Sequence, residues 1–102
     1  MTESEKNNIL IKAIRQGQLG TALEALAAGA DIEAADPQGR PGLPLRIASL
    51  QGNAAIVLAL LERGAKAQGA PHIAEALRPM QAALRGKHTD VVHLLSQYGV
   101  VV

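Results

Sequence analysis

The sequence contains no cysteine, no phenylalanine and no tryptophan, and Tyr98 is its one tyrosine. Without cysteine, the chain can form no disulfide, bind no zinc through thiolates and use no cysteine nucleophile. Without large aromatic side chains, its core has to be built from Leu, Ile, Val and Ala, and hydrophobic residues make up 48% of the chain. Since small side chains at helix contacts suit helices that stack at short distances, we expect closely packed helices.

Net charge and long apolar runs are also scarce. The net charge of +1 at pH 7 gives no electrostatic reason to expect binding to nucleic acid or to an anionic membrane. No apolar run approaches the roughly 20 residues that a membrane-spanning helix needs. The first residues, MTESEKNN, are too polar for a signal or transit peptide. We expect one soluble, cytoplasmic domain that covers residues 1–102.

The chain repeats itself with a period of 35 residues. Three sets of residues fall in register at this spacing: Gly29, Gly64 and Gly99; Leu10, Leu45 and Met80; Ala13, Ala48 and Ala83. A fixed period in this range indicates stacked copies of one supersecondary unit, each burying the next. We place three units at about residues 5–35, 36–70 and 71–102.

The middle unit shows the pattern most clearly. Pro44 suits the first residue of a helix because its φ is fixed and it has no backbone donor to leave unpaired. Gly52 can adopt the positive φ that ends this helix. A second helix is predicted from residue 53 or 54 to just before Gly64. Each unit is therefore expected to hold two short amphipathic helices.

The outer units carry the same signals in less regular form. Thr2 and Glu5 have the spacing of a capping box, with Ser4 as a rival N-cap. Gly17 is expected to end the first helix, and the next helix should stop at Gly29. In the third unit we predict helices over about 78–85 and 89–97.

The two connections between units differ. Asp36-Pro37-Gln38-Gly39 is a strong turn signal, which predicts a hairpin-like loop without regular strands. At the corresponding place in the second connection, Pro71 is followed by good helix formers up to Leu77. This predicts a short helical turn that begins at Pro71.

These features resemble an ankyrin repeat array. The matching segments are Leu43-Pro44-Leu45-Arg46-Ile47-Ala48-Ser49 for the family's T-P-L-H-x-A-A helix, Gly52-Asn53 for its G-H turn, Ile56-Val57-Leu58-Ala59-Leu60 for its second helix and Gly29-Ala30-Asp31-Ile32-Glu33-Ala34 for its G-A-D-x-x-A exit. The resemblance covers about residues 8–99. The period of 35 exceeds the family's unit of about 33 residues, and 71–77 lacks the family's D-x-x-G tip.

The resemblance implies an all-α fold: an ankyrin-repeat solenoid of stacked helix-turn-helix units with long hairpin-like loops. It also implies a non-enzymatic module that binds another protein through its loop tips and its concave helix face. The residues that this places at the surface are Arg15, Gln16, Asp36, Gln38, Arg40, Leu50, Gln51, His72 and Arg85. Leu50 is the most informative, because an apolar side chain at an exposed position is unusual. The alternatives are that these are ordinary exposed polar residues and that Leu50 covers the core.

No residue pattern points to catalysis, a cofactor or a metal. The sequence has no G-x-S-x-G, no H-E-x-x-H and no Gly-rich phosphate loop. His88 and His93 are five residues apart, a poor spacing for one helical face. In the ankyrin family, a histidine beside the turn within a unit usually caps or packs. We expect no enzymatic activity and no cofactor.

The C-terminal unit suggests an alternative function. Its apolar residues are Val91, Val92, Leu94, Leu95, Tyr98 and Val100–Val102. Either the last valines fold back over the final helix pair, or this apolar end pairs with a second copy or with a partner. Pairing with a second copy would make the chain a small homo-oligomeric regulatory or structural protein, a homodimer in its simplest form.

Overall fold

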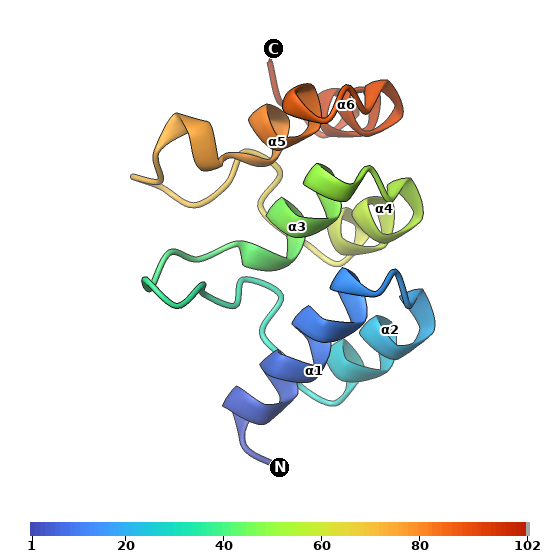
Figure 1. Cartoon of the computed structure of the whole chain (residues 1–102), viewed down its shortest axis with the longest axis vertical. Helices are drawn as coiled ribbons and strands as arrows, with labels where there is room; N and C mark the ends of the chain where they lie inside the picture. The colour runs from blue at the N-terminus through green and yellow to red at the C-terminus, as the bar shows by residue number, and fades with distance from the viewer. Residues whose placement is uncertain (102) are drawn as a thin grey trace.

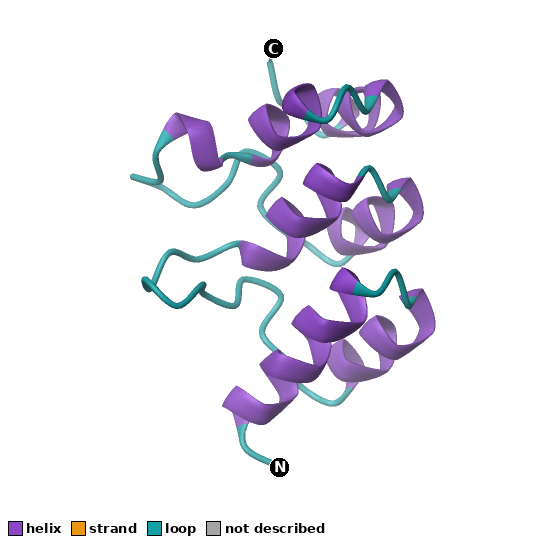
Figure 2. Cartoon of the chain, viewed as in Figure 1, coloured by secondary structure: helices purple, strands orange, loops and turns teal. Residues whose placement is uncertain are grey.

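The computed structural model describes residues 1–101; Val102 lies outside the described residues. This part of the chain is all-α, as predicted, and contains no strand (Figure 2). Its helices are α1 (Glu3–Arg15), α2 (Leu19–Ala27), α3 (Leu43–Gln51), α4 (Ala54–Glu62), α5 (Pro79–Arg85) and α6 (Thr89–Gln97), with one 3-10 turn, η1 (Glu75–Leu77).

The helices form three pairs that are stacked along the long axis of the molecule (Figure 1). α1, α3 and α5 form one layer, in which α3 packs against both α1 and α5. α2, α4 and α6 form the second layer, in which α4 packs against α6. The two long loops project on the side of the first layer, and the molecule measures 39 × 27 × 20 Å. This is a helical repeat-like arrangement.

The 35-residue repeat of the sequence is also seen in which side chains are buried. Two sets of equivalent residues are buried to the same depth: Leu10, Leu45 and Met80 are 0%, 2% and 4% exposed, and Ala13, Ala48 and Ala83 are 1%, 0% and 0% exposed. The alanines let neighbouring helices approach closely, while the larger side chains fill the space between pairs. One continuous core therefore runs through all three units.

Two helix ends lie where local sequence signals predict them, and a third differs from its prediction by one residue. The hydroxyl of Thr2 accepts a hydrogen bond from the Glu5 N–H at 3.1 Å, and the Glu5 carboxylate accepts one from the Thr2 N–H at 3.1 Å, which completes the capping box. Gly52 has a φ of +75° and ends α3. Pro44 is the second residue of α3, since the helix begins at Leu43.

The first loop is hairpin-like, as predicted. Its arms are joined by backbone hydrogen bonds from Asp36 N–H to the Arg40 carbonyl at 2.9 Å and from Leu43 N–H to the Ala34 carbonyl at 3.0 Å. The predicted start of the second loop's helical turn is wrong. His72 has a φ of +67°, which a right-handed helix does not allow, so helical structure begins only at Glu75.

Ser49 interrupts the apolar register and provides a test of the packing. Its equivalents in the outer units are Ile14 and Leu84. Ser49 is 0% exposed, and its hydroxyl has no hydrogen-bond partner among residues 1–101. A buried hydroxyl without a partner destabilises the fold because it has lost its bonds to water.

Replacing Ser49 with alanine should therefore increase the free energy of unfolding by about 1 kcal/mol, which raises the melting temperature by roughly 4–8 °C. Ser96 on α6 is exposed, so Ser96→Ala is the control for the change in helix propensity. Thermal and urea unfolding of both variants measure the difference. A Ser49→Ala variant that is less stable than wild type would contradict the expectation.

Candidate binding surface

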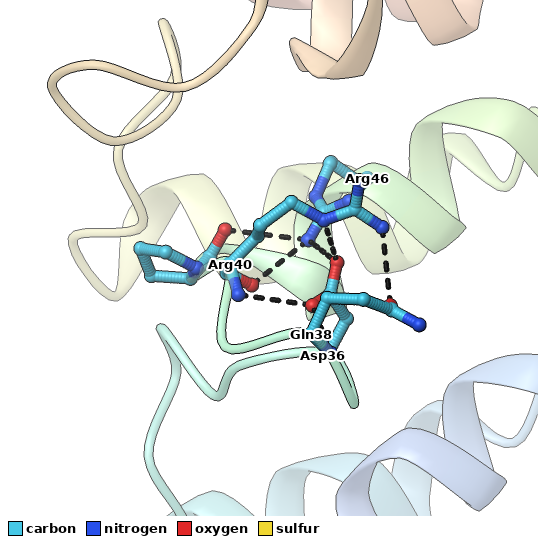
Figure 3. Close-up of polar contacts among 5 residues, drawn as sticks. Asp36, Gln38, Arg40 and Arg46 are labelled. Atoms are coloured by element: carbon cyan, nitrogen blue, oxygen red, sulfur yellow. Dashed lines mark hydrogen bonds and ion pairs between the residues drawn. The ribbon is translucent and has the colours of Figure 1, made fainter.

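Asp36 organises the tip of the first loop. One carboxylate oxygen, Oδ1, accepts hydrogen bonds from the Gln38 and Arg40 N–H groups, both at 2.9 Å. The other, Oδ2, forms ion pairs with Arg40 Nε at 2.7 Å and Arg46 Nη2 at 3.1 Å (Figure 3). Arg46 also donates to the Arg40 carbonyl at 3.0 Å, so it ties the loop to the start of α3.

These contacts determine the charge of Asp36. Burial alone would raise its pKa. The hydrogen bonds from Arg40 and Arg46 and the positive charge of Arg40 outweigh burial and hold the pKa of Asp36 well below its usual range. The carboxylate is therefore ionised at neutral pH and shared by two arginines, which leaves this cluster with a net positive charge.

The expected exposure of Asp36 is wrong, because the residue is only 8% exposed. It turns inward because the loop and the two guanidinium groups supply enough donors to replace water. Gln38 and Arg40 lie at the exposed tip, as expected, and the Arg40 side chain is 46% exposed. Arg46 was not among the predicted site residues. Its signal in the sequence was weak: an arginine ten residues after an aspartate, across a turn.

Neighbouring units are also joined at the last turns of α1 and α3. Gln51 Nε2 donates to the Arg15 carbonyl at 3.1 Å, and His88 Nε2 bonds to the Leu50 carbonyl at 2.9 Å. The two carbonyls are in equivalent positions, 35 residues apart. Since a carbonyl can only accept, His88 Nε2 carries the proton. Gln51 and His88 thus each cap a helix of the preceding unit, which agrees with the expected capping role of His88.

Two pockets lie side by side between the second and third units. One, of about 360 Å³, lies between the two loop tips, and the other, of about 160 Å³, lies between α3 and α5. Leu77 lines both of them, and we call the pair the inter-unit groove. The groove is lined by Gly39, Arg40, Pro41, Leu43, Arg46, Ile47, Leu50, Pro71, His72, Ile73, Ala74, Leu77, Ala82 and Arg85.

The groove brings together four of the nine predicted site residues: Arg40, Leu50, His72 and Arg85. Leu50 is 51% exposed, so it lines a surface and does not close the core. His72 is exposed and lies at the rim with its positive φ, a strained conformation for a residue other than glycine.

The other five predicted residues do not line the groove. Arg15 and Gln16 are exposed at the end of α1, and Gln38 lies at the first loop tip. Gln51 has its amide bonded to the first unit, and Asp36 is buried.

The apolar residues of the C-terminal unit are largely used within the chain. Val91 and Leu95 are 0% exposed. The Val100 N–H donates to the Leu95 carbonyl at 3.1 Å and its side chain packs against the core, so this valine folds back as one of the two alternatives expects. Val101 is 89% exposed and does not fold back.

Among residues 1–101, no three His, Asp or Glu side chains are grouped so that they could hold a metal ion. Within the same residues, no helix has both the length and the hydrophobicity needed to cross a bilayer. No family model and no curated protein matches the sequence. The functional proposal therefore depends on the arrangement of the residues themselves.

Proposed function

We propose that this chain is an ankyrin-type repeat protein that binds a partner protein through its loop tips and the exposed side of α3 and α5, and that it is not an enzyme. The observation that carries the proposal is the inter-unit groove. It gathers exposed residues from two units and both loops, Arg40, Leu50, His72 and Arg85, into one surface. The absence of cysteine fits a reducing, cytoplasmic location.

Three features support the ankyrin type. The loops project on the side of α1, α3 and α5 (Figure 1), which is the face that the resemblance assigns to binding. His88 follows the turn between α5 and α6 and caps the Leu50 carbonyl, and the resemblance implies a capping or packing role for a histidine beside this turn. Helix pairs that share a linear core need neighbours for their stability, and this chain has three such pairs.

The composition of the groove supports protein binding. Leu50 is an apolar side chain that is half exposed on a well-packed helix, beside two arginines, Arg46 and Arg85. Protein interfaces are enriched in arginine and pack apolar groups at their centre. A surface on rigid helices loses little conformational freedom when a partner binds, which favours affinity.

Self-association through the C-terminal unit is the alternative proposal. Tyr98 and Leu84 are 44% and 39% exposed at this end of the stack. Val91 and Leu95 are already buried, so less apolar surface is free for a second copy than the sequence suggests.

A pair of matched variants tests the proposed face. Leu50→Asp places a charge in the groove, and Leu58→Asp makes the same change on α4, where Leu58 is 37% exposed. In affinity capture from the source cells with quantitative mass spectrometry, the partner recovered by wild type should fall by about fivefold or more with Leu50→Asp. Leu58→Asp should recover the same amount as wild type.

Circular dichroism and light scattering of each bait establish that the variants are folded and report their oligomeric state. Equal recovery by the two variants would contradict binding at the groove. A wild-type chain that forms dimers and recovers no other protein would favour self-association instead.

A further inference from the structure

Building on the proposed function, we infer that the inter-unit groove binds an acidic, amphipathic peptide segment of the partner. Carboxylates of the segment pair with arginines at the rim of the groove, and its apolar side chains lie on the leucines. Three observations carry this inference: the charge of the lining, the donors of Arg85 that have no acceptor among residues 1–101, and the half-exposed Leu50.

The charge of the groove has one sign. Its lining holds Arg40, Arg46 and Arg85, and no Asp or Glu from the described residues. Asp36 lies behind this lining and makes both ion pairs found among residues 1–101, with Arg40 and Arg46. Asp36 offsets one of these three positive charges, so the groove has a net positive charge in a chain whose overall charge is only +1.

Arg85 is the cation that is best placed for a partner. Its Nη1 donates to the Ala76 carbonyl at 2.7 Å, which anchors the guanidinium beside the groove. Within residues 1–101 it has no carboxylate partner, and its other N–H groups have no acceptor. An anchored, planar guanidinium can bind a carboxylate with little loss of side-chain entropy.

The floor of the groove is apolar. Leu43, Ile47, Leu77 and Ala82 line it together with Leu50, whose side chain is half exposed. Ile47 and Ala82 are buried, so Leu50 is the apolar side chain that a bound segment would cover most. A purely acidic segment would leave Leu50 in contact with water, and a purely apolar segment would remove water from Arg85 without supplying a carboxylate. A basic segment would be repelled by all three arginines. A segment that carries both carboxylates and aliphatic side chains meets both requirements.

A random library of twelve-residue peptides displayed on phage provides the probe. Peptides selected on the wild-type chain should be enriched in Asp and Glu combined with aliphatic residues. The strongest peptide is then synthesised with a fluorescent label, and its Kd is measured by anisotropy. We expect binding to weaken several-fold between 0.05 and 0.5 M salt, because the Debye length falls to a few Å.

Arg85→Glu should raise the Kd of this peptide by about tenfold or more, since it replaces an attraction by a repulsion. Arg63→Glu is the matched control. Arg63 lies at the end of α4 with Nη1 bonded to the Ala59 carbonyl at 3.1 Å, and its replacement should change the Kd by less than about twofold. Arg85→Gln removes the positive charge without adding a negative one, so its comparison with Arg85→Glu separates the lost attraction from the added repulsion.

Selected peptides that are neutral or basic, and that lose binding with Leu50→Asp, would overturn the inference and leave the proposed function intact. Binding that is unchanged in Arg85→Glu and Arg85→Gln would overturn it as well. Failure to enrich any peptide over an unrelated protein also counts against an acidic segment. The capture experiment with Leu50→Asp and Leu58→Asp decides the proposed function separately.

Discussion

Replacing Gly52 with alanine is expected to lower the free energy of unfolding by about 2–4 kcal/mol, from two separable causes. Gly52 has a φ of +75°, where an L-residue is strained by about 1–2 kcal/mol. An alanine Cβ would also overlap the ring of His88 from the next unit. The ring cannot move aside without losing the hydrogen bond from its Nε2 to the Leu50 carbonyl.

The chain itself provides controls for each cause. Gly64 has a φ of +90°, and a Cβ there would meet no atom within 4 Å, so Gly64→Ala tests strain alone. Gly86 has a φ of −82°, and a Cβ there would overlap the His88 ring at Cδ2 and Nε2 and lie 3.1 Å from the Leu50 carbonyl oxygen, so Gly86→Ala tests overlap without backbone strain. We expect each to cost about 1–2 kcal/mol, less than Gly52→Ala.

Urea unfolding of these three variants measures how much each lowers the free energy of unfolding. The His88 ring lies against both Gly52 and Gly86, and in a His88→Ala background this space is empty. Gly52→Ala should then lower the free energy of unfolding by about as much as Gly64→Ala, roughly 1–2 kcal/mol. A loss at Gly52 that is unchanged by His88→Ala would show that the two residues are not coupled. The packing of the His88 ring against Gly52 and Gly86 would then have no role in joining the second unit to the third.

The helix ends of this fold could be predicted because their signals are local. Thr2 with Glu5 forms the capping box, and Gly52 ends α3, both at the positions that the sequence indicates. The repeat register also predicts that Leu50 and Arg85 occupy equivalent places on adjacent helices, and both line the inter-unit groove. A periodic pattern carries this information because residues in register face the same environment.

The loops could not be predicted as well, because their shape depends on distant contacts. The turn at Asp36 was predicted, but its carboxylate points inward because Arg46, from α3, reaches back to it. The second loop begins with good helix formers, and the positive φ of His72 still prevents a helix before Glu75. Arg40 and His72 are not in equivalent positions of the 35-residue repeat. The sequence therefore does not predict that both line one pocket, as they do in the structure.

Replacing Asp36 with asparagine should lower the melting temperature by several degrees at neutral pH. The variant removes both ion pairs and leaves the largely buried Arg46, whose side chain is 11% exposed, beside an amide. Breaking one partner of a buried pair destabilises the fold because the other charge is left without compensation. Asp31→Asn is the control, since the exposed Asp31 accepts one hydrogen bond from the Glu33 N–H at 2.8 Å and pairs with no arginine.

The effect of Asp36→Asn should also depend on pH with a definite sign. The arginines lower the pKa of Asp36 in the folded chain below the unfolded value of about 3.9. The carboxylate therefore stabilises the fold fully above about pH 5, and this contribution is lost as the pH falls through 4 towards the folded pKa. The difference in melting temperature between wild type and Asp36→Asn should be largest near pH 7 and should shrink below pH 4.

Thermal unfolding followed by circular dichroism between pH 2.5 and 7 checks this, with Asp31→Asn measured alongside. A wild-type chain whose advantage over Asp36→Asn is constant over this range would show that the contribution of Asp36 does not depend on its charge. The result bears on the binding surface as well. Because Asp36 holds Arg40 and Arg46 at the groove, the Asp36→Asn variant should also loosen the tip of the first loop while the helix stack stays folded.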